Sequence, residues 1–242
     1  MIIDHNNAKK IHIHFGGCGG SYSYLFGLAT YLQQNYDLSD VIFSGISAGN
    51  IMCVLCILNI DIEKMHELIN IPLLIKLQNY KLKAFCNFIP EIKQIMLKIL
   101  NEDKNNYRKI TNRLFINITH IPSFRNRIIS EFYSNEDLVD CIMASCHIPF
   151  YNTSFFYNFR NKYYIDGYIS SDDSFVNCYL GKNYITLKFN ITTFRELENN
   201  FLFISTCDKL SCKLFKYGYY DIQENIIKYH NYLKYKLLTS KI

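Results

Sequence analysis

Four glycines fall within five positions near the start of the chain, in the stretch IHIHFGGCGGSYSYLFGLATYL (residues 11–32). The whole chain has only 10 glycines in 242 residues, so this clustering needs a physical reason. Glycine weakens both strands and helices, yet the cluster lies between an apolar strand-like run and a helix-like run. The pattern therefore predicts a strand–loop–helix unit whose loop must turn tightly or bring its backbone close to another group.

Strand-like and helix-like runs alternate along the chain, which predicts βαβ units and an α/β fold. We expect a three-layer α/β/α sandwich with a mostly parallel central sheet, and a single domain over residues 1–242, since no linker or internal repeat interrupts the pattern. The expected strands span residues 10–15, 40–45, 113–121, 127–134, 162–166 and 183–191. The expected helices span residues 22–36, 48–58, 135–146 and 221–238, with further helical segments over 62–103 separated by Pro72 and Pro90.

A second motif, IFSGISAGNIM, contains the pattern G-x-S-x-G from Gly45 to Gly49, with Ser47 at its centre. Between a strand and a helix, this pattern is typical of a nucleophile elbow, a tight turn that presents the serine hydroxyl above the edge of the sheet. The positive N-terminus of the following helix would favour negative charge near Ser47. An ordinary strand–helix turn is the alternative, but the context is the one that the motif requires.

If Ser47 is a nucleophile, the first glycine cluster has a functional explanation. Attack on an ester creates an oxyanion, which backbone N–H groups can stabilise. We therefore interpret Gly17, Cys18 and Gly19 as an oxyanion loop. The alternative is a phosphate cradle of the dinucleotide-binding type, but the third glycine of that pattern is missing and no well-placed acidic residue follows the next strand.

These motifs resemble those of the patatin-like phospholipase family, and particularly its animal triacylglycerol-lipase branch. The glycine loop and G-x-S-x-G are followed by Asp166-Gly167-Tyr168, which matches the family's distal Asp-Gly-Gly/Ala except at Tyr168. Further similar segments are LVDCIMASCHIPFY (138–151) and KYGYYDI (216–222), so the resemblance covers about residues 10–225. The chain also has Tyr22 where the family's G-x-G-x-x-G ends in glycine, and Ser21 where many members have a basic residue.

The resemblance implies a lipid acyl-ester hydrolase that uses a Ser–Asp dyad on a three-layer fold. Ser47 would be the nucleophile and Asp166 the general base, without histidine, metal or cofactor, and Gly45, Gly49 and Gly167 would support the turns. One alternative is a conventional Ser–His–Asp triad that uses His230 with Asp166 or Asp208. Another is a lipid-binding scaffold without activity, which Tyr22 and Tyr168 would favour.

Other candidate residues have simpler interpretations. Cys53 and Cys56 form a C-x-x-C in an apolar run, and without further ligands they are expected to be buried thiols rather than a metal site. His147, just before Ile148-Pro149, is expected to be a turn or pocket-wall residue rather than a base. His12 and His14 alternate on one strand, so we expect them to share one face of the sheet.

Composition limits the partners and the compartment. The net charge of +5 includes no Lys/Arg run, which favours a solubilising surface over nucleic-acid binding. Nine cysteines and a start, MIIDHNNAKK, without an apolar signal-peptide core predict free thiols in a reducing, cytoplasmic compartment. No run is long enough to predict a transmembrane helix.

A lipid enzyme must still reach its substrate, which suggests peripheral contact with a membrane or lipid surface. The helical insertion at about residues 60–105 has apolar residues at helical spacing with lysines between them, a pattern that could dock on anionic lipid. The same pattern would arise if these helices simply covered one face of the sheet. The residues concerned are Leu73, Leu74, Leu77, Ile92, Ile95, Met96 and Ile99, with Lys76, Lys81, Lys83, Lys93 and Lys98.

Overall fold

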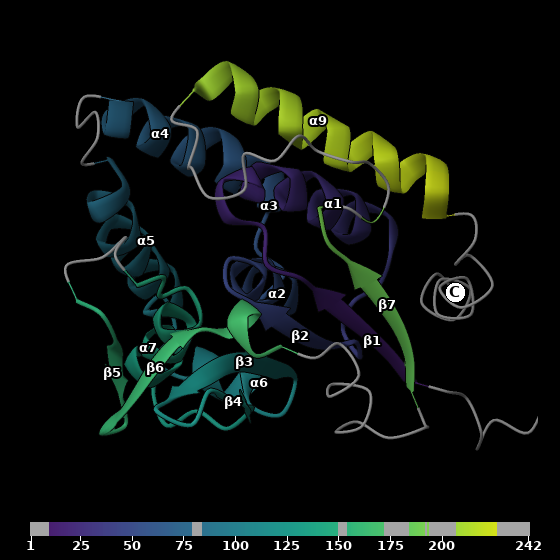
Figure 1. Cartoon of the computed structure of the whole chain (residues 1–242). Coiled ribbons are helices and arrows are strands. Elements are labelled where there is room, and N and C mark those ends of the chain that lie inside the picture. Colours follow the sequence, from purple (N-terminus) through teal and green to yellow (C-terminus); the bar gives the residue numbers. More distant parts are fainter. Residues whose placement is uncertain are drawn as a thin grey trace, which may run out of the picture.

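The computed structural model describes residues 10–78, 84–149, 154–171, 184–191, 193 and 207–226. It shows helices packed against a central seven-stranded sheet, which confirms the predicted α/β class (Figure 1). The strands are β1 (Lys10–Phe15), β2 (Ile42–Ile46), β3 (Leu114–Ile121), β4 (Arg125–Ile129), β5 (Tyr157–Phe159), β6 (Lys162–Asp166) and β7 (Tyr184–Phe189).

The sheet is mixed, with one parallel and one antiparallel half. Its order is β5-β6-β3-β2-β1-β7, and β4 pairs with β3 outside this path. The pairings β7–β1, β1–β2 and β2–β3 are parallel, as βαβ units require. The pairings of β3 with β4 and β6, and of β5 with β6, are antiparallel. The predicted parallel ladder therefore covers four strands, and an antiparallel extension continues it.

Strands β2 and β6 meet end to end along the same edge of β3. β4 pairs with β3 from Ile116 to His120, and this range overlaps the β3 residues that pair with β2 and with β6. Because each edge of a strand pairs with one neighbour at a time, β2 and β6 must both lie on the edge opposite β4. The end of β2 is level with Asn117, and the end of β6, at Asp166, is level with Ile118. The chain directions are opposite, so the carboxyl ends of the two strands face each other.

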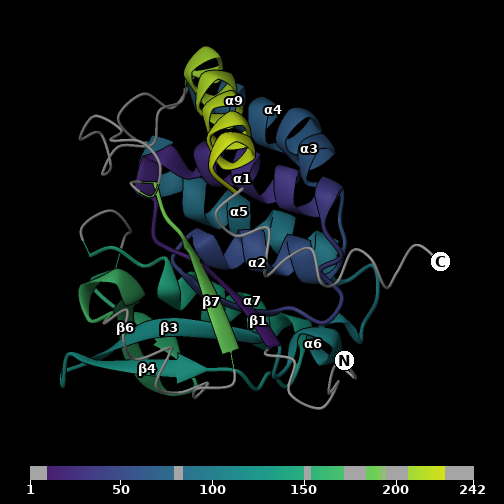
Figure 2. The ribbon, with the colours of Figure 1, turned by 90° about the vertical axis from the view of Figure 1, so that its right-hand side faces the viewer.

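The helices form successive layers beside the sheet (Figure 2), in keeping with the predicted α/β/α arrangement. α2 and α7 contact the strands, α5 packs on α7, and α1 packs on both α2 and α9. Gly27 and Gly218 let α1 and α9 approach closely, since a Cβ at either would lie 2.0 Å from a carbonyl oxygen of the other helix. The helices are α1 (Tyr22–Asn35), α2 (Gly49–Ile57), α3 (Ile62–Met65), α4 (Ile71–Gln78), α5 (Ala84–Leu100), α6 (Asn106–Ile110), α7 (Asn135–Ser145) and α9 (Asp208–Asn225).

The two faces of β1 differ, as strand alternation predicts. Ile13 and Phe15 join the hydrophobic core. His12 and His14 share the other face, where both rings hydrogen-bond the hydroxyl of Ser44 at 2.8 and 2.6 Å. Burial, together with the charges of His14 and Lys188, lowers the pKa of His12 to about 3, so this face is polar but uncharged at His12.

The prolines of the helical insertion do not separate helices as predicted. α3 continues through a π-helical turn, His66–Asn70, directly into α4, so Pro72 lies in the first turn of α4. Pro90 lies within α5, whose residues Phe88 and Met96 are buried, so packing outweighs the local cost of the proline.

Three further boundaries differ from the predictions. The strand expected at residues 127–134 is β4, which begins and ends earlier. The last described helix, α9, begins at Asp208, well before the expected 221–238, and the part of that range beyond residue 226 lies outside the described residues. β5 and α6 were not predicted, since both are too short to show a clear period.

The apolar residues named for the helical insertion face inward, while Leu68 and Ile75 of the same region are exposed. Lys81 and Lys83 lie outside the described residues. Leu73, Leu74, Leu77, Met96 and Ile99 are buried, and Ile92 and Ile95 pack against the core. Lys76 pairs with Glu91 at 2.6 Å, and Lys93 pairs with Asp140 at 2.7 Å. The arrangement matches the alternative in which these helices cover the interior. In the part of the chain that the structure describes, no helix is long and apolar enough to cross a membrane.

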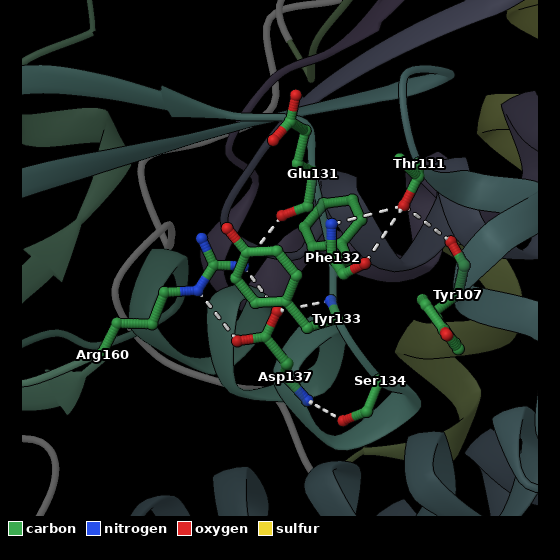
Figure 3. A network of polar contacts seen from close by, with 8 residues as sticks. All are labelled: Tyr107, Thr111, Glu131, Phe132, Tyr133, Ser134, Asp137 and Arg160. Atoms are coloured by element: carbon green, nitrogen blue, oxygen red, sulfur yellow. Dashed lines mark hydrogen bonds and ion pairs between the residues drawn. The ribbon is translucent and has the colours of Figure 1, made fainter.

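A polar network ties the β5–β6 hairpin to the start of α7 (Figure 3). At the hairpin turn, Arg160 donates to both carboxylate oxygens of Asp137, at 2.9 and 2.5 Å, and to the carbonyl oxygen of Glu131 at 2.8 Å. Asp137 also accepts the N–H of Tyr133, and its own N–H donates to the helix-capping hydroxyl of Ser134. The guanidinium lies 4.4 Å from the centre of the Tyr133 ring. This network fixes the hairpin whose second strand ends at Asp166.

Candidate active site

Ser47 occupies a strained turn between β2 and α2. Its φ of 53° lies in the left-handed region, which a residue with a side chain adopts only when its surroundings impose it. The surroundings are close main-chain contacts at both glycines of the motif. A Cβ at Gly49 would lie 2.3 Å from the carbonyl oxygen of Phe15, and one at Gly45 would lie 2.8 Å from the backbone of Asn50. The turn therefore requires glycine at both positions, as predicted for a nucleophile elbow.

Ser145, at the end of α7, holds this turn from the interior. Its hydroxyl accepts the backbone N–H of Ser47 at 2.9 Å and the side-chain amide of Asn50 at 3.0 Å, and it donates to the carbonyl oxygen of Asn117 at 2.6 Å. The Asn50 amide also donates to the carbonyl oxygen of Ser47. Ser145 is fully buried, so these bonds have no competition from solvent. It thus joins the serine turn, α2 and β3 at one point.

Asp166 lies opposite Ser47, where β6 ends. Its carboxyl group lies close enough to the Ser47 hydroxyl for that hydroxyl to lower its pKa, and its Oδ1 accepts the N–H of Tyr168 at 2.8 Å. Only 4% of Asp166 is exposed, and this burial raises its pKa to about 6, which outweighs the lowering by Ser47 and by the Tyr168 N–H. Gly167 allows the turn after β6 to pass β3, since a Cβ there would lie 2.1 Å from the carbonyl oxygen of Asn117.

The main chain of Asp166 is held on both sides. Its N–H donates to the carbonyl oxygen of His147 at 2.8 Å, and its carbonyl oxygen accepts the hydroxyl of Thr119 at 2.7 Å. The imidazole of His147 contacts the carbonyl oxygen of Ser154 at 3.0 Å. His147 is therefore a turn residue beside the site, as predicted, and it holds Asp166 through its backbone.

The glycine loop passes beside this pair. A Cβ at Gly17 would lie 3.3 Å from the Tyr168 ring and 3.5 Å from Ile46, so Gly17 lies between the two strand ends. Gly19 has a φ of 47°, which turns the chain into α1. The N–H groups of Gly17, Cys18 and Gly19 make no hydrogen bond to another described residue. Their role as an oxyanion hole stays a prediction.

Two buried thiols border the same space. The Ser47 hydroxyl lowers the pKa of the Cys146 thiol, and Cys18 interacts electrostatically with both Cys146 and Asp166. Burial raises the pKa of both thiols, so they are neutral at physiological pH. Sequence reasoning missed both Ser145 and Cys146 as site residues. The segment MASCHIP that carries them resembles the family in sequence, but this resemblance does not single out the two residues.

An apolar cavity extends from this site into the helices. Gly19 and Ala48, neighbours of the loop and of Ser47, form part of its wall. Side chains of α1, α2, α4, α5 and the π turn complete it, and its volume is about 50 Å³. Apart from Asn70 and the Tyr22 hydroxyl, its side chains are apolar, so the cavity suits a hydrocarbon group.

The remaining predicted residues lie away from the site or outside the description. His230 is outside the described residues, and Asp208 is the first residue of α9. Cys53 and Cys56 are free and buried, as expected for core thiols. Among the residues that the structure describes, no group of three or more His, Cys, Asp or Glu side chains could hold a metal ion.

Comparisons with known proteins agree with these motifs. Omega-hydroxyceramide transacylase of Mus musculus is 29% identical over 131 residues, which cover 53% of this chain and 22% of that protein. The 1-acylglycerol-3-phosphate O-acyltransferase PNPLA3 of Homo sapiens is 26% identical over 209 residues, 81% of this chain and 43% of that protein. Patatin-like phospholipase domain-containing protein 4 of Homo sapiens is 27% identical over 167 residues, 66% of this chain and 64% of that protein. The chain thus spans less than half of the first two relatives.

A crystal structure of VipD from Legionella pneumophila has a TM-score of 0.48 and 11% sequence identity, covering 89% of this chain and 66% of that one. The family model for patatin-like phospholipases matches residues 13–175, a range that contains the glycine loop, Ser47 and Asp166. This chain is therefore a member of the patatin-like phospholipase family.

Proposed function

We propose that the protein cleaves acyl esters of lipids, with Ser47 as nucleophile and Asp166 as general base. The observation that carries this proposal is the position of the Ser47 hydroxyl beside a buried carboxyl group whose pKa is raised to about 6. A carboxylate of this kind is ionised at neutral pH but more basic than an ordinary aspartate, which suits it to accept a proton. The family membership and the apolar cavity support a lipid substrate.

In the first half of the reaction, the Ser47 oxygen attacks the carbonyl carbon of the ester while Asp166 takes the hydroxyl proton. The negative charge moves to the carbonyl oxygen, where the N–H groups of Gly17, Cys18 and Gly19 and the N-terminus of α2 would stabilise it. When the tetrahedral intermediate collapses, the bond to the leaving alcohol breaks and Asp166 returns the proton to that alcohol. The acyl group then remains as an ester of Ser47.

In the second half, Asp166 activates an acceptor that attacks the acyl-Ser47 ester. Water as acceptor releases a fatty acid and makes the protein a hydrolase. An alcohol as acceptor gives a new ester instead, and this second candidate is favoured by the relatives named as a transacylase and an acyltransferase. Both outcomes use the same acyl-enzyme, so one nucleophile test applies to both.

A fluorophosphonate probe on the purified protein tests the proposal. We expect the parent to be labelled and to release fatty acid from at least one member of a lipid panel. Ser47→Ala should abolish both labelling and turnover with almost no change in thermal midpoint, because the removed hydroxyl contributes little packing. Ser39→Ala, at an exposed turn, is the matched control and should be labelled like the parent.

Retained turnover in Ser47→Ala would overturn the mechanism. A parent that binds lipid but is never labelled would support the scaffold alternative. Loss of activity in a folded His230→Ala variant would support the conventional triad.

We also propose that the protein meets its lipid at a membrane or lipid surface in a reducing, cytoplasmic compartment. The seven cysteines among the described residues are free, which suits that compartment. Phe155, Phe156 and Tyr163 are exposed and in ring contact with one another, near the strand end that carries Asp166. Tyr168, which is 71% exposed, lies beside Gly17 of the glycine loop. Exposed aromatic residues beside a site are suited to an interfacial position.

Co-sedimentation with phosphatidylcholine vesicles tests this surface. The double variant Phe155→Ser, Phe156→Ser should bind at least severalfold less than the parent, because two exposed apolar side chains are lost. The control, Leu68→Ser with Ile75→Ser, removes two exposed apolar residues of the helical insertion and should bind like the parent. The reverse pattern would assign docking to the insertion instead.

A further inference from the structure

The cavity beside Ser47 is narrow. Roughly 10–15 Å³ holds one water-sized group, so a cavity of about 50 Å³ has room for only about four such groups. For comparison, an engineered cavity of about 150 Å³ in another protein binds benzene. If the acyl chain of the substrate enters here, only its first few carbons fit before the chain meets the wall.

Tyr22 forms that wall close to the reacting group. It follows Gly19 by three residues and lies in the first turn of α1, and both residues line the cavity. Its ring packs against Phe88 and Phe26, with centroids 5.4 and 6.1 Å away. Only 4% of Tyr22 is exposed, so the ring lies inside the molecule.

A hydrogen bond fixes the ring in this position. The Tyr22 hydroxyl donates to Oδ1 of Asn70 at 2.5 Å, and Asn70 is itself buried in the π-helical turn. The Asn70 amide lies 3.4 Å from the hydroxyls of Ser23 and Ser211, which connects the turn to α1 and α9. Breaking this bond would leave a buried polar group without a partner, so the ring does not move aside freely.

We propose that Tyr22 is a specificity-determining residue that restricts the substrate to short acyl chains of about four carbons. This inference depends on the function proposed above, since it assumes that the acyl group is attached to Ser47. The ring excludes longer chains by volume, and the bond to Asn70 keeps it in place. Tyr22 of α1, and not Ser47 or Asp166, thus limits the length of the acyl chain.

p-Nitrophenyl butyrate and p-nitrophenyl laurate test the proposal, because they share one leaving group and differ only in chain length. The parent should have the higher kcat/KM for the butyrate. Tyr22→Ala should raise the laurate-to-butyrate ratio of kcat/KM at least tenfold, because the ring is removed. Tyr22→Phe keeps the ring but loses the bond to Asn70, so it should raise the ratio less than Tyr22→Ala does. Leu32→Ala, which truncates another buried residue of α1 outside the cavity, should leave the ratio unchanged.

If Tyr22→Ala does not fold, Tyr22→Leu tests the same point with less loss of packing and should also raise the ratio. A ratio within twofold of the parent in a folded Tyr22→Ala or Tyr22→Leu variant overturns the proposal, as does a parent that prefers laurate. A parent that neither reacts with the fluorophosphonate probe nor cleaves either ester rejects the proposed function itself. The two failures are therefore distinguishable.

Discussion

The two halves of the sheet contribute differently to the site. The parallel half, β7-β1-β2-β3, carries Ser47 and the glycine loop, and its reactive turn is held by fully buried groups such as the Ser145 hydroxyl. The antiparallel half carries Asp166 at the end of a hairpin, and its far turn is held by the partly exposed pair of Arg160 and Asp137. The nucleophile is thus positioned by buried groups alone, whereas the hairpin that carries the base has buried bonds at Asp166 and a partly exposed ion pair at its far turn.

This difference indicates which substitutions should disturb the geometry of Ser47 and Asp166 most. Buried hydrogen bonds around Ser47 are costly to lose and unaffected by salt. An ion pair with some exposure is screened by salt and is worth less. Changes in the antiparallel half should therefore act gradually, except at Asp166 itself, and changes around Ser47 should act more sharply.

The largest effect is expected at the base. Asp166→Asn removes the proton acceptor and should lower kcat/KM on the order of 10³-fold, since general base catalysis contributes about 10²–10⁴. Asp208→Asn is the matched control, because Asp208 is the first residue of α9. This variant should retain parental activity. If Asp166→Asn keeps more than a tenth of the activity, the base lies elsewhere.

The same carboxyl group predicts a pH dependence. Because its pKa in the folded protein is about 6, kcat/KM should rise with pH up to about 6 and level off above it. The folded pKa is raised above the ordinary value of 3.8, so the stabilisation from this group is complete below pH 4 and is lost as pH rises through 6. The loss amounts to about 3 kcal/mol. Asp166→Asn should therefore gain stability relative to the parent between pH 4 and pH 7, as measured by denaturant unfolding.

Ser145→Ala should have an intermediate effect, because it deprives the Ser47 N–H and the Asn50 amide of their shared acceptor. We expect a loss of about 1–3 kcal/mol in unfolding free energy. Misplacement of the nucleophile should lower kcat about tenfold, with KM unchanged. Ser134→Ala, at the other end of the same helix, removes a capping bond and should cost about 1 kcal/mol without lowering kcat. Equal kcat values in the two variants would show that Ser145 only stabilises the fold.

The smallest effect is expected at the hairpin turn. Arg160→Ala removes a two-pronged ion pair and should cost about 1–2 kcal/mol, with less than a fivefold loss of kcat. The parent should lose part of the same stability in 1 M salt, and the variant should not. Lys64→Ala, which breaks an exposed ion pair with Asp61, should hardly change the free energy of unfolding or its dependence on salt. A larger kcat loss in Arg160→Ala than in Ser145→Ala would reverse the comparison.

The parallel half was largely predictable because its signals are local. Gly45 is needed for a contact within its own turn, against Asn50, and the strands before both loops are short, buried and rich in β-branched or aromatic residues. For that reason β1, α1, β2 and α2 agree with their predicted ranges to within about two residues.

The antiparallel half was harder to predict because its signals are distant in sequence. β5 has only three residues, and its existence depends on pairing with β6. The bond from Ser47 to Ser145 joins residues 98 positions apart, which no periodicity can show. The π turn before Pro72 depends on the buried contacts of His66 and Asn70, not on local propensity. What sequence reasoning missed is therefore the set of long-range contacts that bring the two halves together.

Because β2 and β6 meet end to end, the distance between Ser47 and Asp166 depends on the register of both strands along β3. No backbone ladder runs directly from one strand into the other, and β3 alone pairs with both at that point. A slip of either strand along β3 would separate Ser47 from Asp166 by a full residue step while leaving most helices and hydrogen bonds intact. During gradual denaturation, turnover should therefore disappear before the far-ultraviolet circular dichroism signal, and enzymatic assay becomes the most sensitive measure of the register of this sheet.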